Sequence, residues 1–117
     1  MGLRPVALYL SNDDVRALLP MNECVEVLED LFRQEARGEV DNRPRERLRF
    51  PDSPWTSTLM GGTVLGLDAL AFRTSSATLL YNTRSGALEA VVAPNDLAWI
   101  RTGAASGVAA DARSQFS

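Results

Sequence analysis

The sequence predicts a single α+β domain over residues 1–117, in which two N-terminal helices pack on a mixed or antiparallel sheet and a helix follows at the C-terminus. Apolar residues recur every three or four positions over residues 21–37, which is the spacing of an amphipathic helix. Residues 45–92 change to short apolar segments bounded by Pro, Gly, Ser or Asn, which indicate about five or six short strands. Helical spacing returns over residues 94–108.

The first two elements are short. The apolar segment Val6–Leu10 predicts a strand. Ser11 can cap a following helix, and Asp14 occupies the N3 position of an imperfect capping box, so a helix over Asp13–Leu19 is expected. Pro20 ends this helix, because proline cannot continue the hydrogen-bond ladder.

The most regular segment is Met21–Arg37. Its apolar positions share one helical face and are Met21, Cys24, Val25, Leu28, Leu31 and Phe32. Gly38 fits the C′ position that ends a helix. Cys24 lies within the apolar face, so we interpret it as a small core residue, with a reactive thiol as the alternative.

The predicted strands lie in the middle of the chain. They are Arg45–Phe50, Thr58–Gly61, Leu70–Arg73, Ala77–Tyr81 and Leu88–Val92. The turn residues Thr83–Gly86 separate the last two and predict a hairpin.

The C-terminal helix is expected to begin at Pro94. Leu97, Ile100, Ala104 and Val108 are spaced as one face of this helix. Residues 111–117 show no clear periodicity and are expected to be a frayed or truncated tail.

Composition excludes several kinds of site. The chain has no histidine and one cysteine, which removes histidine-based catalytic pairs, imidazole–zinc sites and internal disulfides. A net charge of −3 gives no general reason to expect nucleic acid or a membrane as partner. No apolar run is long enough to span a bilayer, and no signal peptide is recognisable, so a cytoplasmic location is the default expectation.

Four arginines alternate with other residues at positions Arg43, Arg45, Arg47 and Arg49. Alternate residues of a strand share a face, so these guanidinium groups would project together. Such a face can bind a carboxylate or phosphate, or it can be a solvated face that keeps a sheet edge soluble. Nucleic acid is less favoured, because the chain is acidic overall and aromatic residues do not interleave with the arginines.

Arg101 precedes a run of small residues, Thr102–Ala110, in which Gly103 and Gly107 lie one turn apart. Small residues let the helix backbone approach a neighbour closely. Arg101 then either makes a surface ion pair or is presented to a substrate carboxylate or a cofactor phosphate. Met60 lies at the end of a predicted strand, where core packing is the ordinary role of a methionine.

An ordered set of segments extends over nearly the whole chain: Leu10–Val15, Leu19–Glu29, Arg43–Arg45, Leu59–Met60, Leu79–Asn82 before Ser85–Gly86, and Arg101–Gly107. In order and spacing these segments resemble the N-terminal domain of the ornithine cyclodeaminase / mu-crystallin family. The Arg-Thr-Gly-Ala-Ala-Ser-Gly run of the last segment is the strongest part of this likeness.

The resemblance implies a domain that supplies half of the substrate site and the homodimer interface of an NAD(P)-dependent enzyme. Members of this family act on amino acids or cyclic imines by hydride transfer, and some by deaminating cyclisation. On this resemblance Arg45 and Arg101 would hold the substrate carboxylate, and Met60 would line the same pocket. It assigns no catalytic residue, no cofactor-binding residue and no metal to this chain.

The chain departs from the family pattern at several positions. The family's active-site lysine is expected on the strand around Gly66–Arg73, where Arg73 is the nearest cation and Asp68 is the alternative alignment. Arginine stays protonated and cannot exchange protons as a tuned lysine can. Thr58 stands where cyclodeaminases that act on a diamino acid carry a glutamate, which disfavours ornithine as the substrate. The segment between Arg73 and Leu79 is also shorter than in the family.

In the family, the helix that carries Arg101 leads into a Rossmann domain with a glycine-rich dinucleotide loop. No such loop occurs in this sequence, so the expectation is a truncated family member that is inactive alone. Two alternatives stay open. One is a stand-alone dimeric module that binds a small carboxylate without catalysis. The other is a degenerate reading frame whose tail arose from a frame change.

Overall fold

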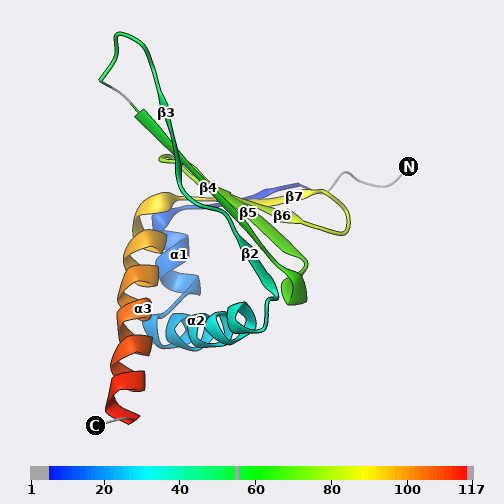
Figure 1. Cartoon of the computed structure of the whole chain (residues 1–117). Coiled ribbons are helices and arrows are strands. Elements are labelled where there is room, and N and C mark those ends of the chain that lie inside the picture. The colour runs from blue at the N-terminus through cyan, green and yellow to red at the C-terminus, as the bar shows by residue number, and fades with distance from the viewer. Residues whose placement is uncertain (1–5, 55, 116–117) are drawn as a thin grey trace.

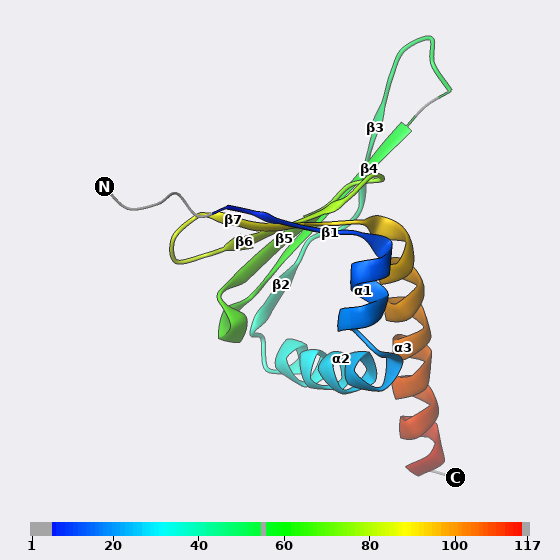
Figure 2. The ribbon, with the colours of Figure 1, turned by 180° about the vertical axis from the view of Figure 1, so that it is seen from behind.

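Three α-helices lie on one side of a mixed sheet in the computed structural model of this chain (Figures 1 and 2). The structure describes residues 6–54 and 56–115, and for residues 111–115 it describes the helical backbone alone. The helices are α1 (Asn12–Leu18), α2 (Met21–Ala36) and α3 (Pro94–Gln115). The strands are β1 (Leu8–Leu10), β2 (Val40–Asn42), β3 (Glu46–Arg49), β4 (Thr56–Val64), β5 (Ala69–Arg73), β6 (Thr78–Asn82) and β7 (Leu88–Val92), with a 3₁₀ turn at Leu65–Leu67.

The sheet has the strand order β1-β7-β6-β5-β4-β2. Strands β1 and β7 pair in parallel, and the remaining pairs are antiparallel. Strand β3 pairs with the first half of β4, and the two extend as an arm beyond the sheet (Figure 1). Within the described residues, the sheet has helices on one face and is therefore not a doubly wound Rossmann sheet. The predicted α+β class is confirmed.

Local sequence signals position the helices as expected. Helix α1 has a complete capping box, in which the Ser11 hydroxyl accepts a hydrogen bond from the Asp14 N–H at 3.1 Å and the Ser11 N–H donates to the Asp14 carboxylate at 2.9 Å. These bonds hold the pKa of Asp14 below its ordinary value, because both the backbone and the side chain of Ser11 bond to the carboxylate. Helix α2 ends before Gly38, whose φ of +77° favours glycine.

The structure has one strand that the sequence did not predict, and its strand β4 is longer than predicted. Strand β2 was not predicted, because Val40-Asp41-Asn42 contains one apolar residue. Strand β4 continues through Gly62, where the absence of a side chain permits close pairing: a Cβ atom there would lie 2.9 Å from the carbonyl oxygen of Asp41.

Helix α3 continues to Gln115, whereas the sequence predicted no regular structure over residues 111–117. The alanine-rich turns before Asp111 favour helix, and the segment up to Gln115 contains neither glycine nor proline to stop it. The remaining two residues of the expected frayed tail, Phe116 and Ser117, lie outside the described residues.

The core that joins the helices is small. Cys24 and Leu28 of α2 are buried against Ala104 of α3, which has no exposed surface. Around them pack the partly buried residues Leu19, Val25, Leu31, Ile100, Ala105 and Val108. Burial raises the pKa of the Cys24 thiol, which agrees with its interpretation as a core residue.

Small residues of α3 permit this contact. A Cβ atom on Gly107 would lie 3.2 Å from Cγ2 of Val25, and one on Gly103 would lie 2.9 Å from Cε of Met21. The two helices therefore approach each other where α3 has no side chain. At the other end of α3, the Asp96 N–H donates to the Asn12 side chain at 3.1 Å, and Arg16 Nε lies 2.7 Å from an Asp96 carboxylate oxygen, which ties α1 to α3.

Strand β5 presents different side chains to the two faces of the sheet. Its Ala71 and Arg73 lie on the helix side, since they line one cavity together with Leu97 and Arg101 of α3. Its Leu70 and Phe72 lie on the opposite side, where Phe72 packs edge-on against Tyr81 with ring centroids 6.2 Å apart. Among the described residues no helix covers this opposite face (Figures 1 and 2). None of the described helices combines the length and apolar character needed to cross a membrane.

Candidate functional site

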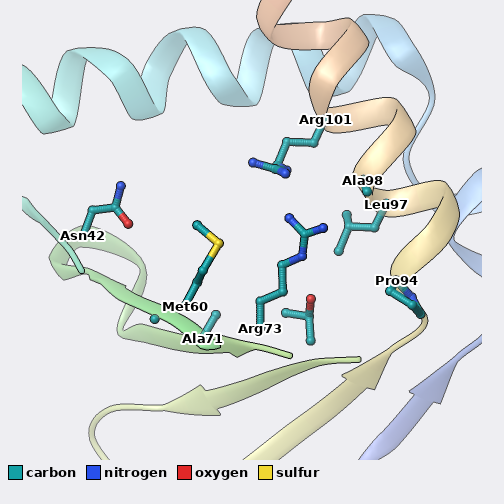
Figure 3. Close-up of a pocket in the computed structure, with 10 residues that line it drawn as sticks. Asn42, Met60, Ala71, Arg73, Pro94, Leu97, Ala98 and Arg101 are labelled. Carbon is teal, nitrogen blue, oxygen red and sulfur yellow. The ribbon is translucent and has the colours of Figure 1, made fainter. Parts of the chain in front are cut away.

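The candidate site lies where strands β4 and β5 approach the first turns of helix α3. Met60 of β4 pairs directly with Arg73 of β5, so their side chains project together from the helix side of the sheet. Arg101 comes to the same region from α3, one turn after Leu97. Figure 3 shows the Arg73 and Arg101 guanidinium groups facing one another across the space between sheet and helix, with Met60 beside them.

Arg73 and Arg101 line a first cavity of about 220 Å³. Met60, Ala71 and Leu97 give this cavity a largely apolar wall, and Asn42 of β2 adds an amide opposite the arginines (Figure 3). A small apolar cavity with a few convergent polar groups is the usual character of a small-molecule site.

Arg45 lines a second, adjoining cavity of about 160 Å³. Arg73 and Met60 belong to the walls of both cavities. The second cavity is more polar, since its other lining residues are Thr58, Thr74 and Ser75. Ser75 accepts a hydrogen bond from the Thr58 N–H at 3.3 Å, which leaves its hydroxyl hydrogen available to an acceptor.

The lining of these two cavities carries positive charge and no acidic residue. Among the described residues, none forms an ion pair with Arg45, Arg73 or Arg101. The pKa of Arg73 is lowered by partial burial and by the positive charges of Arg101 and Arg45. Partial burial is the larger cause of this lowering, and the neighbouring positive charges add to it. An anion would relieve this repulsion, and a guanidinium offers it paired, planar donors.

The residues predicted from sequence lie close together but not in one cavity. Arg101 lines the first cavity and Arg45 the second, while Met60 lines both. The four alternating arginines do not share one strand face as expected, because the chain from Arg43 to Arg45 is not in a strand. Arg43 instead pairs with Asp41 at 3.2 Å and lines a separate cavity with Phe72, on the far side of the sheet.

The sequence pointed to Arg73 as the cation nearest to the family's lysine position, but it did not place Arg73 among the substrate-binding residues. The alternation in β5 of small residues and Arg73 with large apolar ones was the available signal, but the strand register that places Arg73 opposite Met60 cannot be read from it. The other residue considered at the family's lysine position, Asp68, lies elsewhere and pairs with Arg84 at 3.0 Å. Arg73 is therefore the charged residue of this segment that lines the site.

A third cavity of about 770 Å³ adjoins the first between α2, β4 and α3. Met60 and Arg101 lie on its boundary, and Leu28, Phe32 and Ala105 make much of its wall apolar. Two acidic residues, Glu35 and Asp41, also line this third cavity. Arg101 therefore lines both the first and the third cavity, and it is exposed.

The described residues contain no cluster of three or more acidic, cysteine or histidine side chains that could hold a metal ion. Nor does any described strand lead through a glycine-rich turn into a helix: β7 reaches α3 through Ala93-Pro94-Asn95. Residues 6–54 and 56–115 thus do not fit a dinucleotide pyrophosphate, which such turns cradle, and we assign no NAD(P)-binding residue to them.

Comparison with known proteins finds no protein-family model that matches the sequence and no curated protein of significant similarity. Solved structures do match. The iminosuccinate reductase of Paracoccus denitrificans, solved with NAD+, has a TM-score of 0.78 and 21% identity, covering 86% of this chain and 36% of its own. The Delta(1)-pyrroline-2-carboxylate reductase of Thermococcus litoralis, solved with NADH and L-proline, has a TM-score of 0.77 and 24% identity, with the same coverage.

A probable ornithine cyclodeaminase from Bordetella pertussis Tohama I has a TM-score of 0.78 and 19% identity, covering 90% of this chain and 36% of its own. This chain thus spans about a third of the length of the solved proteins that it matches. At these identities the likeness concerns the fold. The resemblance inferred from the sequence is therefore confirmed at that level: the chain has the fold of a part of the ornithine cyclodeaminase / mu-crystallin proteins.

Proposed function

We propose that this chain binds a small amino-acid or imino-acid carboxylate, and that it supplies this carboxylate site to an NAD(P)-dependent reductase or deaminase of the ornithine cyclodeaminase type. Three guanidinium groups, from the end of β5, from α3 and from the residue before β3, line the two small cavities around Met60. Neither of these two cavities has an acidic lining residue, and this observation carries the proposal. A site with uncompensated positive charge and an apolar wall suits a small organic anion.

In this proposal Arg45 and Arg101 hold the ligand's carboxylate, as the family resemblance implies, and Met60 shapes the apolar wall. The names of two structural neighbours, iminosuccinate reductase and pyrroline-2-carboxylate reductase, also specify carboxylate substrates. When bound, NAD(P) would supply the hydride. The described residues of this chain orient the carboxylate and exclude water from one side of it, and no hydride or proton step is assigned to them.

We further propose that the helix-free face of the sheet is a homodimer interface. Phe72 on this face is 45% exposed, and in the short strand β1 at the sheet edge Leu8 and Tyr9 are 64% and 67% exposed. Apolar side chains left exposed on an uncovered sheet face favour an association surface there. A partner at this face would add apolar burial that a core of this size does not supply alone.

A second candidate is a dimeric carboxylate-binding module without catalysis. Arg73 favours it, because an arginine that lines the site remains protonated and can bind an anion without exchanging a proton. The two candidates differ in one measurement, which is NAD(P)H oxidation by the purified chain in the presence of an imino or keto acid. Turnover supports the enzyme, whereas binding without turnover supports the module.

The carboxylate site itself is tested by calorimetric titration of the chain with L-proline, L-alanine and pyruvate. We expect at least one of them to bind, and Arg101→Ala to weaken that binding by about 1.5–3 kcal/mol, which is the usual worth of a hydrogen bond to a charged group. Arg49→Ala is the matched control, because Arg49 is an exposed arginine on β3 that lines none of the cavities described above. Equal losses in the two variants would refute the site.

A further inference from the structure

The two small cavities at the site have different chemical characters but share a wall. The first, which contains Arg101, is bounded mainly by apolar groups such as Ala71 and Leu97. The second, which contains Arg45, is bounded by hydroxyl-bearing residues. Arg73 stands between them and lines both.

A ligand with one carboxylate would satisfy this arrangement incompletely. Its carboxylate could pair with the arginines of one cavity, while the rest of the molecule would meet guanidinium and hydroxyl groups in the other. An alkyl group there would take water from these polar groups without replacing their hydrogen bonds, which costs free energy. A second carboxylate would accept hydrogen bonds from the same groups.

The charge balance of the two cavities also favours a ligand with a second carboxylate. Arg45, Arg73 and Arg101 bring three positive charges to the shared wall, and no described residue of either cavity offers a negative one. One carboxylate leaves two of these charges uncompensated, whereas two carboxylates leave one. The positive neighbours that lower the pKa of Arg73 act through the same repulsion that a second anionic group would reduce.

A structural role would require a different setting for Arg73. Half-buried arginines that stabilise a fold are ordinarily paired with a carboxylate, and no described residue provides one for Arg73. Its neighbours within reach of charge are two further arginines. The position of Arg73 is therefore better explained by binding of an anionic ligand than by its contacts within the fold.

We propose that Arg73 is a specificity-determining residue that selects a small dicarboxylate, with one carboxylate in the Arg101 cavity and the other in the Arg45 cavity. This inference rests on the proposed carboxylate site and adds the class of its ligand. It differs from the family resemblance in that Arg45 and Arg101 each hold a separate carboxylate, with Arg73 between them. In it Arg73 contacts both carboxylates, one on each side of Met60, while Ser75 can donate a hydrogen bond to the second.

The test compares succinate with succinamate, its monoamide, which has nearly the same shape and one carboxylate fewer. Both are titrated into the full chain by calorimetry. We expect succinate to bind about tenfold more tightly, since hydrogen bonds to a charged acceptor are roughly twice as strong as neutral ones. In Arg73→Met we expect that preference to disappear, with succinamate binding changed less than about threefold.

Two further variants keep the result interpretable. Arg73→Lys retains the positive charge but not the planar guanidinium, so it should keep part of the preference for succinate over succinamate. This variant replaces Arg73→Met in the comparison if Arg73→Met loses the native circular dichroism spectrum. Arg47→Met removes an exposed arginine of β3 that lines none of these cavities, and it should leave both affinities unchanged.

Equal affinities for succinate and succinamate in the unmodified chain would overturn the inference and leave the carboxylate site standing. Inorganic phosphate binding more tightly than succinate would also overturn it, in favour of a phosphate site. If neither these ligands nor the monocarboxylates bind, the proposed function fails and the inference fails with it.

Discussion

The guanidinium groups of Arg73 and Arg101 line one cavity, although Arg73 ends strand β5 and Arg101 belongs to helix α3. Two like charges at a shared cavity oppose folding unless an anion joins them. Their juxtaposition therefore links the stability of the empty fold to the binding of a ligand.

The first prediction follows from this link. Arg101→Gln should leave the free energy of unfolding of the ligand-free chain unchanged or raise it by up to about 1 kcal/mol, because it removes repulsion at an exposed position. The same change should weaken carboxylate binding by about 1.5–3 kcal/mol, as expected for Arg101→Ala. Urea unfolding monitored by circular dichroism, together with calorimetry, measures both effects, and a marked loss of stability in this variant would contradict the repulsion argument.

A second prediction concerns the glycines of α3. Gly103→Ala should be neutral or stabilising by up to about 1 kcal/mol, since alanine favours helix and the atom it approaches is the flexible end of Met21. Gly107→Ala should gain less, because it meets the stiff, branched side chain of Val25 at 3.2 Å.

Gly107→Leu should then cost about 1–3 kcal/mol through overpacking against α2. Thermal unfolding of the three glycine variants gives the order of their stabilities. A larger loss for Gly103→Ala than for Gly107→Ala would show that Met21 cannot move.

The third prediction concerns the thiol of Cys24. Burial raises its pKa, while the positive charge of Arg101 partly opposes the rise. Its alkylation by iodoacetamide near neutral pH should therefore be slow in the native chain and fast in urea. Arg101→Gln should raise the pKa further and slow alkylation again.

The pH dependence has a definite sign. Because the folded pKa is raised, the contribution of Cys24 to stability is present below the ordinary thiol pKa and is lost as pH rises through the folded pKa. In Cys24→Ala the corresponding alkaline loss should be smaller. Rapid alkylation of native protein would contradict the buried placement.

A fourth prediction concerns the cap of α1. Ser11→Ala should cost about 0.5–2 kcal/mol at neutral pH, since it removes the hydroxyl that accepts from the Asp14 N–H. The pKa of Asp14 is lowered in the fold, so the part of the cap that depends on its carboxylate is present above the ordinary aspartate pKa and is lost as pH falls through the lowered value. Thermal melts at neutral and strongly acidic pH should show a smaller difference between Ser11→Ala and the parent chain in acid.

Elements with strong local signals were predictable from the sequence. Helix α2 follows from its apolar face and from Gly38, and the β6–β7 hairpin follows from its turn, where the Asn82 side chain accepts from the Arg84 and Ser85 N–H groups and Gly86 has a φ of +73°. These features depend on residues close together in the chain. They are therefore visible without knowledge of the tertiary structure.

Features that depend on pairing across the sheet were not predictable. Strand β2 exists because Gly62 lets the Asp41 backbone approach, and the role of Arg73 exists because the register places it opposite Met60. A shift of one residue in that register would turn Arg73 to the other face without changing the sequence pattern. Arg45, Met60 and Arg101 were identified through a family resemblance, and the carboxylate that they are expected to hold stays a prediction.

Strand β5 contributes to two surfaces. Its Ala71 and Arg73 face the candidate site, whereas its Leu70 and Phe72 face away from the helices. A deletion or insertion of a single residue upstream of Arg73 would exchange the two sets. It would turn Phe72 toward α3 and carry the guanidinium to the open face. Reading-frame-preserving length changes in this strand should therefore be far less tolerated than substitutions at the same positions, so the strand is constrained more tightly in length than in composition.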